Sequence, residues 1–248
     1  MKLLVLGANG KTGRLVVEQA LAAGHTVTAF ARDPSTVKLS HERLSVVNGD
    51  AVFISDLNAA LKGQDAVIST IGGGKRKLIE KTTQSLITAL EESGVKRVVC
   101  MSTFIATPNF KPTGMMKLFP RLVRGMAKDD VTGMKLLESS DLDWTIVHAT
   151  LLENKPKTGF RLVGPDEAVT AKNHVNRADV AECLLATVSD RGTIRQALLI
   201  TGLGRNNGLR ERPRQEILGA RHDREGARIL PGPLRRPAAR RDDRTDVG

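Results

Sequence analysis

The glycine motif GANGKTG at residues 7–13 is the feature that most constrains how this chain can fold. It follows the apolar run Lys2–Leu6 directly and opens an amphipathic segment that begins at Thr12. Glycines at these spacings between a strand and a helix allow a tight turn, close approach of a pyrophosphate, and close packing of helix on strand. The N–H groups that begin the helix then face the negative charge. The motif predicts a dinucleotide site, and its alternative is a glycine-rich turn that holds no ligand.

Short β-rich runs alternate with amphipathic stretches over the first two hundred residues. We expect strands at Lys2–Leu6, Thr26–Ala31, Leu44–Val47, Ala66–Thr70, Arg97–Met101, Trp144–Val147 and Ala197–Thr201. We expect helices at Thr12–Ala23, Lys77–Ser93, Asp129–Ser140 and Ala178–Ser189. This alternation predicts a single α/β domain with a Rossmann-type, doubly wound parallel sheet and helices on both faces. In such a sheet, ligands bind at the C-terminal ends of the strands.

The end of the second expected strand indicates which cofactor is bound. A basic residue there accommodates the 2′-phosphate of NADP, whereas an acidic residue binds the ribose 2′-hydroxyl of NAD. The segment FARD at 30–33 presents Arg32 first, and Lys38 follows, so NADP, as NADPH, is favoured. Asp33 keeps NAD as an alternative, unless its role is to cap the turn before Pro34.

The ends of the third and fourth expected strands add two more candidate contacts. Gly49-Asp50 is placed to reach the adenine. The segment from Thr70 to Gly74 offers a floor of small residues beneath the ribose and pyrophosphate. A flexible loop is the alternative interpretation of the three consecutive glycines.

Six segments together resemble a known family. They are GANGKTG, ARDPS, NGD, VVCMST from Val98 to Thr103, DLDWTIV and NRADVAECLL. They resemble the atypical short-chain dehydrogenase/reductases, and most of all the NAD(P)H-binding group that includes biliverdin reductase B (flavin reductase) and the NmrA-like proteins. The resemblance runs from Lys2 to about Gly202.

This resemblance implies roles for particular residues. It places Gly7, Gly10, Thr12 and Gly13 at the pyrophosphate, Arg32 at the 2′-phosphate, Asp50 at the adenine, Ile71-Gly72 near the ribose, and Ser102 beside the nicotinamide. The complete set of predicted cofactor residues is Gly7, Asn9, Gly10, Lys11, Thr12, Gly13, Arg32, Asp50, Ala51, Thr70, Ile71, Gly72, Ser102 and Thr103.

The chain departs from the family by containing no tyrosine. The Tyr-x-x-x-Lys acid/base pair of ordinary short-chain dehydrogenases therefore cannot exist here. Flavin reductase-like members work without it, because hydride transfer to a stacked flavin or quinone depends mainly on orientation. We expect an NADPH-dependent reductase of a planar acceptor. The alternatives are a non-catalytic, NmrA-like redox sensor and a truncated or frameshifted product that folds poorly.

Ser102 and His148 are the two candidate catalytic residues. Relatives commonly follow the sixth strand with Arg-Pro, whereas this chain has His148-Ala149. His148 ends a strand on the ligand side, and histidine titrates near neutral pH, although a histidine that fills a partly buried loop is the favoured interpretation. Ser102 could donate to the carboxamide or the substrate, or it could cap the following turn.

Two further segments lie near the expected substrate side. The segment Phe104–Met126 has the length and apolar content of a loop over the substrate, or of a flap or oligomer contact. Asp129 and Asp130, at the expected start of the next helix, are interpreted as helix caps. Lys135 is interpreted as part of a solvated helix face.

The C-terminal segment differs in composition from the rest of the chain. Residues 203–248 hold 12 Arg and no Lys against 7 acidic residues, whereas residues 1–202 use both Lys and Arg. We therefore divide the chain into an NAD(P)-binding domain at 1–202 and a tail at 203–248. The tail is either a solvated, disordered basic segment or the product of a changed reading frame, and neither interpretation gives it a part in the chemistry.

Composition also bears on partners and location. The net charge of +11 suits nucleic acid, but only seven aromatic residues are available for base stacking, so we expect no nucleic-acid partner. No apolar run reaches membrane-spanning length, and we expect no membrane partner. Cys100 and Cys183 suggest neither a disulfide nor a metal site. We expect a cytoplasmic protein whose partner is a small-molecule acceptor, with its oligomeric state left open.

Overall fold

A computed structural model of the chain describes residues 1–72, 77–118 and 120–203. Apart from residue 203, the proposed tail at 203–248 lies outside the described residues. Gly73 and Gly74 also lie outside them.

The described residues form an eight-stranded sheet in the order β3-β2-β1-β4-β5-β6-β10-β8. Its strands are β1 Lys2–Leu6, β2 Thr26–Ala31, β3 Leu44–Asn48, β4 Ala66–Ser69, β5 Arg97–Thr103, β6 Asp143–Ala149, β8 Phe160–Leu162 and β10 Gln196–Gly202. Every neighbouring pair is parallel except β10 with β8, which is antiparallel. A separate short pair joins β7 Leu151–Glu153 to β9 His174–Asn176. The prediction of a doubly wound parallel sheet is confirmed.

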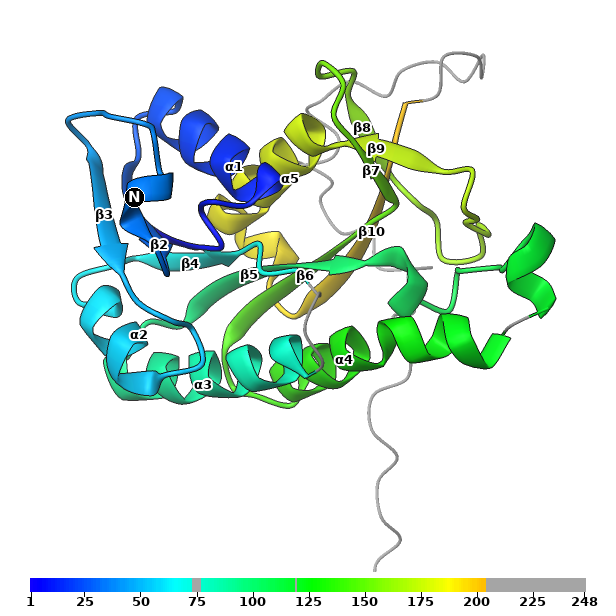
Figure 1. The fold of residues 1–248 in the computed structure, drawn as a ribbon, viewed down its shortest axis with the longest axis horizontal. Coiled ribbons are helices and arrows are strands. Elements are labelled where there is room, and N and C mark those ends of the chain that lie inside the picture. The colour runs from blue at the N-terminus through cyan, green and yellow to red at the C-terminus, as the bar shows by residue number, and fades with distance from the viewer. Residues whose placement is uncertain (73–76, 119, 204–248) are drawn as a thin grey trace, which may run out of the picture. The chain divides into compact units, whose positions relative to one another are not determined.

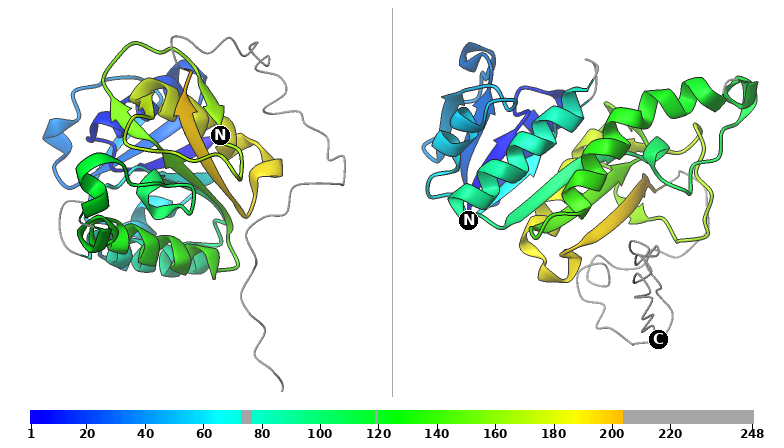
Figure 2. Two further views of the ribbon diagram at one scale, coloured as in Figure 1. Left: turned by 90° about the vertical axis from the view of Figure 1, so that its right-hand side faces the viewer. Right: turned by 90° about the horizontal axis from the view of Figure 1, so that it is seen from below.

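Helices cover both faces of the sheet (Figure 1). One face carries α1 Lys11–Ala22 and α5 Arg177–Ser189, and the other carries α2 Ile54–Leu61, α3 Leu78–Ser93 and α4 Pro120–Glu138. Short 3-10 turns are η1 Pro34–Thr36, η2 Phe104–Ala106, η3 Gly114–Leu118 and η4 Arg191–Thr193. Seen from below, α3 and α4 lie side by side against the strands (Figure 2).

Two apolar layers hold the helices to the sheet. Successive side chains of a strand point to opposite faces, so Leu3 and Val5 of β1 join the layer under α1 and α5. Leu4 and Leu6 join the layer under α2, α3 and α4. Because both faces of the central strands are buried, these strands are continuously apolar.

The helix between β5 and β6 begins earlier than the sequence predicts. We expected a loop over 104–126 and a helix from Asp129, but α4 starts at Pro120 and η3 occupies Gly114–Leu118. Proline is well suited to the first turn of a helix, where its missing N–H has no partner to lose. Asp129 and Asp130 therefore lie within α4 and not at its start. The sequence also gave no signal for α2, β7, β8 and β9, which are all eight residues or shorter.

Candidate functional site

The sheet topology brings the predicted cofactor residues to one edge. The chain leaves β1 toward β2 on one side and returns to β4 on the other, so the strand order reverses at β1, the position where sheets of this kind bind ligands. Each predicted contact lies at the C-terminal end of one of the parallel strands β1 to β5. In strand order these contacts are the glycine turn, Arg32, Asp50, Thr70 and Ser102. Segments that are up to about a hundred residues apart in sequence thus line the same edge.

The glycine turn is closed tightly against the strand ends. Gly7 has φ 76°, and its carbonyl accepts a hydrogen bond from the Gly10 N–H at 2.8 Å. A Cβ on Gly13 would lie 2.1 Å from the Gly7 carbonyl oxygen, so no side chain fits there. The Thr70 hydroxyl donates to the Leu6 carbonyl at 3.0 Å. Thr70 therefore ties β4 to the turn, and this buried contact uses its only donor.

The start of α1 fits a pyrophosphate. Gly10 is its N-cap, no side chain caps the helix, and its first turn holds no acidic residue. Gly10 is exposed, so the backbone is open to a ligand at this point. N–H groups at a helix N-terminus without a side-chain acceptor attract an anion. Lys11, exposed beside Gly10, adds positive charge, while the Thr12 side chain is buried.

Arg14 supports this turn, and sequence reasoning missed it. Its Nη2 donates to Oδ1 of Asn9 at 2.6 Å, and its Nε donates to the Asn9 carbonyl at 3.2 Å. These bonds hold the exposed loop of the motif on the first turn of α1. A basic residue directly after Gly13 was visible in the sequence, but its target depends on the shape of the turn.

Arg32 and Asp33 differ in what they contact. In the described part of the chain, the Arg32 guanidinium has no hydrogen-bond or ion-pair partner, and the side chain is exposed. The Asp33 carboxylate accepts from the Ser35 N–H at 3.0 Å and from the Ser35 hydroxyl, and these bonds lower its pKa. Asp33 is the N-cap of η1, so the capping interpretation is confirmed.

The turn after β3 is shaped by two carboxylates. The Asp50 N–H donates to Asp56 at 3.0 Å, and Asp50 Oδ1 accepts from the Val52 N–H at 3.3 Å. Gly49 is required because a Cβ there would lie 2.4 Å from the Phe30 ring. Ala51 is buried beside it. Across the crevice, Ile71 is half-buried and Gly72 is exposed.

Ser102 and His148 are direct neighbours at the ends of β5 and β6. His148 Nδ1 lies 3.2 Å from the Thr103 carbonyl. Since a carbonyl only accepts, Nδ1 carries the hydrogen, and Nε2 is left as an acceptor. Burial lowers the pKa of His148 to about 4, so the imidazole is neutral at physiological pH. Ser102 is also buried, and its hydroxyl donates to Asp130 at 3.0 Å.

The adjacent residues Asp129 and Asp130 of α4 contact different elements, and neither caps its own helix. Asp129 accepts from the N–H groups of Ile79 at 3.0 Å and Glu80 at 2.9 Å, so it caps the neighbouring helix α3. Asp130 faces Ser102, and burial raises the pKa of its carboxyl. The helix-cap prediction for these residues is wrong because the helix start was misplaced. Lys135 is exposed on α4, as expected.

An apolar wall stands beside this end of the site. Phe104 and Phe110 meet edge to face with ring centroids 5.3 Å apart, and Val169 and Leu199 pack with them. Phe110 forms a β-bridge with Val169. The Asn109 amide donates to three carbonyls of the segment 164–167. The first part of the expected loop over the substrate is therefore joined firmly to the segment before β9.

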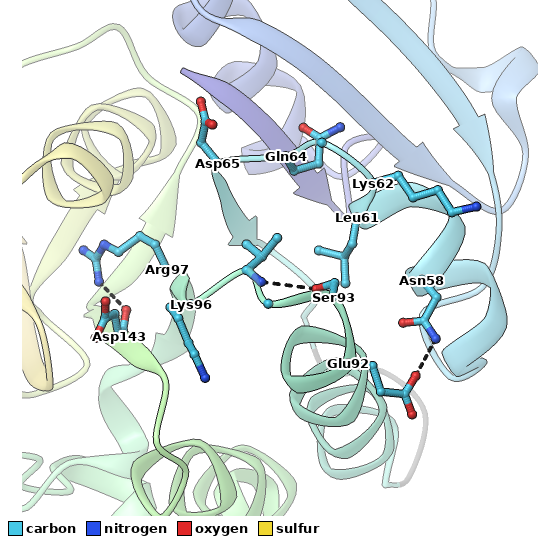
Figure 3. Close-up of a pocket in the computed structure, with 13 residues that line it drawn as sticks. Asn58, Leu61, Lys62, Gln64, Asp65, Glu92, Ser93, Lys96, Arg97 and Asp143 are labelled. Atoms are coloured by element: carbon cyan, nitrogen blue, oxygen red, sulfur yellow. Dashed lines mark hydrogen bonds between the residues drawn. The ribbon is translucent and has the colours of Figure 1, made fainter.

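A hollow lies at the opposite edge of the sheet. It holds about 700 Å³ of open space between the starts of β4, β5 and β6 and the end of α3. Figure 3 shows Asp65, Arg97 and Asp143 around it. The Arg97 guanidinium there donates to the Asp143 carbonyl and to the Thr187 carbonyl near the end of α5. These residues join elements of the fold, and none of them is a predicted cofactor residue.

Neither thiol of the chain is reactive. Cys100 and Cys183 are free and buried, and burial raises the pKa of each to about 12. No group of three His, Cys, Asp or Glu side chains within the described ranges is arranged to hold a metal ion.

The sheet order, the glycine turn and the uncapped start of α1 define a Rossmann-type nucleotide-binding protein. The chain belongs to the NAD(P)H-binding family, whose profile matches residues 7–191. It therefore takes a nicotinamide cofactor. The expected membership of an NAD(P)H-binding family is confirmed.

Relatives of known sequence or structure extend over most of the chain. The uncharacterized sugar epimerase YhfK of Bacillus subtilis is 28% identical over 215 residues, covering 81% of this chain and 94% of its own. A short-chain dehydrogenase/reductase of Veillonella parvula, solved with NADP, has a TM-score of 0.67 at 20% identity and covers 82% and 95%. ChuY, an anaerobilin reductase of Escherichia coli O157:H7, has a TM-score of 0.67 at 23% identity and covers 84% and 100%. At these identities the two structures share the fold.

None of the helices in the described part of the chain combines the length and the apolar character needed to cross a bilayer.

Proposed function

We propose that this protein is an NADPH-dependent reductase that passes hydride to a flavin, a quinone or a similar planar acceptor. The observation that carries the proposal is the edge where the glycine turn, Arg32, Ser102 and His148 gather beside an apolar wall. Family membership and the description of ChuY as a reductase support the reaction class. The NADP in the Veillonella parvula structure supports the cofactor.

The residues of the chain divide the work between binding and orientation. The bound nicotinamide supplies the hydride. The uncapped start of α1 and Lys11 hold the pyrophosphate, and Asp50 holds the adenine. Neutral His148 offers Nε2 as an acceptor, so we assign it an orienting role and not that of an acid. Phe110, which is half-buried and packs edge to face on the buried Phe104, offers apolar surface beside the acceptor.

In this proposal Arg32 sets the preference for NADPH over NADH. Its guanidinium is exposed, whereas the Asp33 carboxylate already caps η1. For Arg32→Ala we expect the Kd for NADPH to rise about 10- to 100-fold, the loss of one charge-assisted contact of about 1.5–3 kcal/mol. The Kd for NADH should change by less than about twofold. Isothermal titration calorimetry measures both, with Arg43→Ala at the start of β3 as the control. Equal losses for the two cofactors would refute the assignment.

Turnover is the direct test of the proposed reaction. Purified protein is mixed with NADPH and either flavin mononucleotide or a naphthoquinone, and the loss of nicotinamide absorbance is followed. We expect oxidation of NADPH with at least one acceptor. A protein that binds NADP and NADPH but oxidises none of it with either acceptor is a sensor, and the reductase proposal is then rejected.

We also propose that residues 1–202 hold the complete cofactor site. The family profile ends at residue 191, and every predicted site residue lies before that point. A form of the protein ending at residue 202 should bind NADPH as tightly as the full chain. Calorimetry suits this comparison better than tryptophan fluorescence, because Trp144 lies at the start of β6, at the edge away from the site. Weaker binding by the shorter form would assign the tail a role.

A further inference from the structure

Asp130 is a half-buried acid of the site that neither the motifs nor the proposed cofactor contacts account for. It lies on α4, and its Oδ1 accepts the Ser102 hydroxyl at 3.0 Å. The backbone N–H of Thr103 also points at this carboxyl. Ser102 and Thr103 end β5, the strand next to the β6 end that carries His148. The carboxyl is thus bonded directly to the residue predicted to lie beside the nicotinamide.

The surroundings of Asp130 raise the pKa of its carboxyl. Burial is the main cause of its raised pKa, and the neighbouring carboxylate of Asp129 adds to it. The hydrogen bonds from Ser102 and Thr103 act in the opposite direction. His148 on β6 is neutral and contributes no positive charge, and Asp129 is engaged with the start of α3. A carboxyl whose pKa is raised is a better-matched proton donor than a free aspartate.

Resting on the proposed function, we propose that Asp130 is the proton source of this reductase and delivers its proton through the hydroxyl of Ser102. The overall reaction consumes NADPH, the oxidised acceptor and one proton, and yields NADP⁺ and the acceptor carrying two more hydrogens. The acceptor accepts the hydride, and one of its heteroatoms takes the Ser102 hydroxyl proton. When Asp130 is protonated, the 3.0 Å contact reverses its direction: the carboxyl O–H donates to the Ser102 oxygen, and the Ser102 hydroxyl hydrogen turns to the acceptor. Asp130 then passes its proton to the Ser102 oxygen as the original Ser102 O–H bond breaks. Solvent then reprotonates Asp130.

Other titratable groups nearby are unsuited to this task. His148, with a pKa of about 4, is almost entirely deprotonated at neutral pH and has no proton to give from Nε2. The Cys100 thiol, with a pKa of about 12, is buried within β5. Asp129 is engaged with two N–H groups at the start of α3 and faces away from Ser102 in its hydrogen bonding. Asp130 is the carboxyl that can both hold a proton and reach Ser102.

The decisive variant is Asp130→Asn, which keeps the shape and one acceptor oxygen but removes the proton. With NADPH and a naphthoquinone, we expect kcat to fall about 10²- to 10⁴-fold, the usual contribution of a general acid. The KM for NADPH should stay within about threefold of wild type. Wild-type kcat should fall as pH rises through the pKa of Asp130, whereas the residual rate of the variant should not show that step.

Glu138→Gln is the matched control, because Glu138 is another α4 carboxyl with a pKa raised by burial, at the far end of the helix. We expect it to leave kcat and the pH profile unchanged. Ser102→Ala should lower kcat as Asp130→Asn does, because it breaks the same relay. The double variant should be little worse than either single one, since the two residues act in sequence.

A second measurement needs no turnover. In protein labelled with ¹³C at aspartate carboxyls, one resonance should titrate at higher pH than that of a free aspartate and vanish in Asp130→Asn. In Ser102→Ala that resonance should titrate at still higher pH, because the bond that lowers its pKa is lost.

The outcomes separate this inference from the proposed function. If wild-type protein oxidises NADPH while Asp130→Asn keeps its full rate and pH profile, the proton relay is wrong and the reductase stands. If the carboxyl titrates like a free aspartate, the relay is wrong whatever the turnover. If wild-type protein oxidises no NADPH, the proposed function fails and the relay fails with it.

Discussion

Replacing Gly13 with alanine is expected to abolish useful NADPH binding and to lower the stability of the domain. The added Cβ would lie 2.1 Å from the Gly7 carbonyl oxygen and 2.8 Å from the Thr70 hydroxyl oxygen. The first of these atoms is backbone and the second is bonded to Leu6, so neither can move without opening the turn. The N–H groups at the start of α1 would then no longer converge on one anion.

We expect the Kd for NADPH to rise at least about 100-fold in Gly13→Ala, equivalent to about 3 kcal/mol of binding free energy. Overpacking of this kind also costs about 1–3 kcal/mol of folding free energy, or a melting temperature lower by about 5–10 °C. Calorimetry gives the first quantity and thermal unfolding followed by circular dichroism gives the second.

Gly125→Ala provides the comparison for a glycine without a packing role. Gly125 lies in α4, and a Cβ there would meet nothing within 4 Å. Alanine should be neutral or should stabilise that helix by up to about 1 kcal/mol. Unchanged NADPH affinity in Gly13→Ala would show that the glycine turn does not form the cofactor site.

Asp179→Ala is expected to be the most destabilising single substitution away from the glycine turn. The Asp179 side chain is 0% exposed, and its carboxylate accepts from the N–H groups of Thr158 at 3.2 Å and Gly159 at 2.8 Å. It also accepts from the Asn176 amide at 3.2 Å. These bonds attach the segment before β8 to the first turn of α5.

Alanine at this position would leave the buried Asn176 amide and the half-buried Gly159 N–H without this acceptor. We expect the free energy of unfolding to fall by about 3–5 kcal/mol, because each orphaned donor costs about 1–3 kcal/mol. For a domain of this size the melting temperature should drop by about 10 °C or more. Chemical denaturation gives the free energy, and thermal unfolding gives the temperature.

Asp141→Ala is the control, because it removes an exposed carboxylate and no buried contacts. The Asp141 side chain is 98% exposed and pairs only with Arg195 at 3.3 Å. Its removal should change the free energy of unfolding by less than about 0.5 kcal/mol. An Asp179→Ala protein as stable as this control would mean that the contacts around α5 contribute little. NADPH affinity of the folded Asp179→Ala protein should be unchanged, since the residue lies outside the predicted cofactor set.

Much of the cofactor side of the site follows from local sequence. The signals for this side lie within a few residues of a strand or helix boundary: the GANGKTG motif, the ends of the early strands and Arg32. All the expected strands form. Parallel strands of one sheet share an edge for their C-terminal ends, so these local signals converge in space without knowledge of any distant contact. The interpretation of Asp33 as a cap was accessible for the same reason.

The substrate side was predicted less well because it is built from short or misplaced elements. β7, β8 and β9 have three residues each, too few for a periodic pattern to be recognised. The start of α4 at Pro120 moved Asp129 and Asp130 from a helix end to its interior. Sequence spacing then no longer indicated which elements these two carboxylates contact.

The sequence by itself determined the fold class, the cofactor edge and the absence of a tyrosine acid, because each rests on residue identity or short-range periodicity. Only the tertiary structure decided that Asp130 meets Ser102 across 28 positions and that Asp129 caps α3 across about 50. It also decided that His148 is neutral. Such contacts and the desolvation that shifts a pKa depend on which distant segments pack together, and a linear pattern does not carry that information.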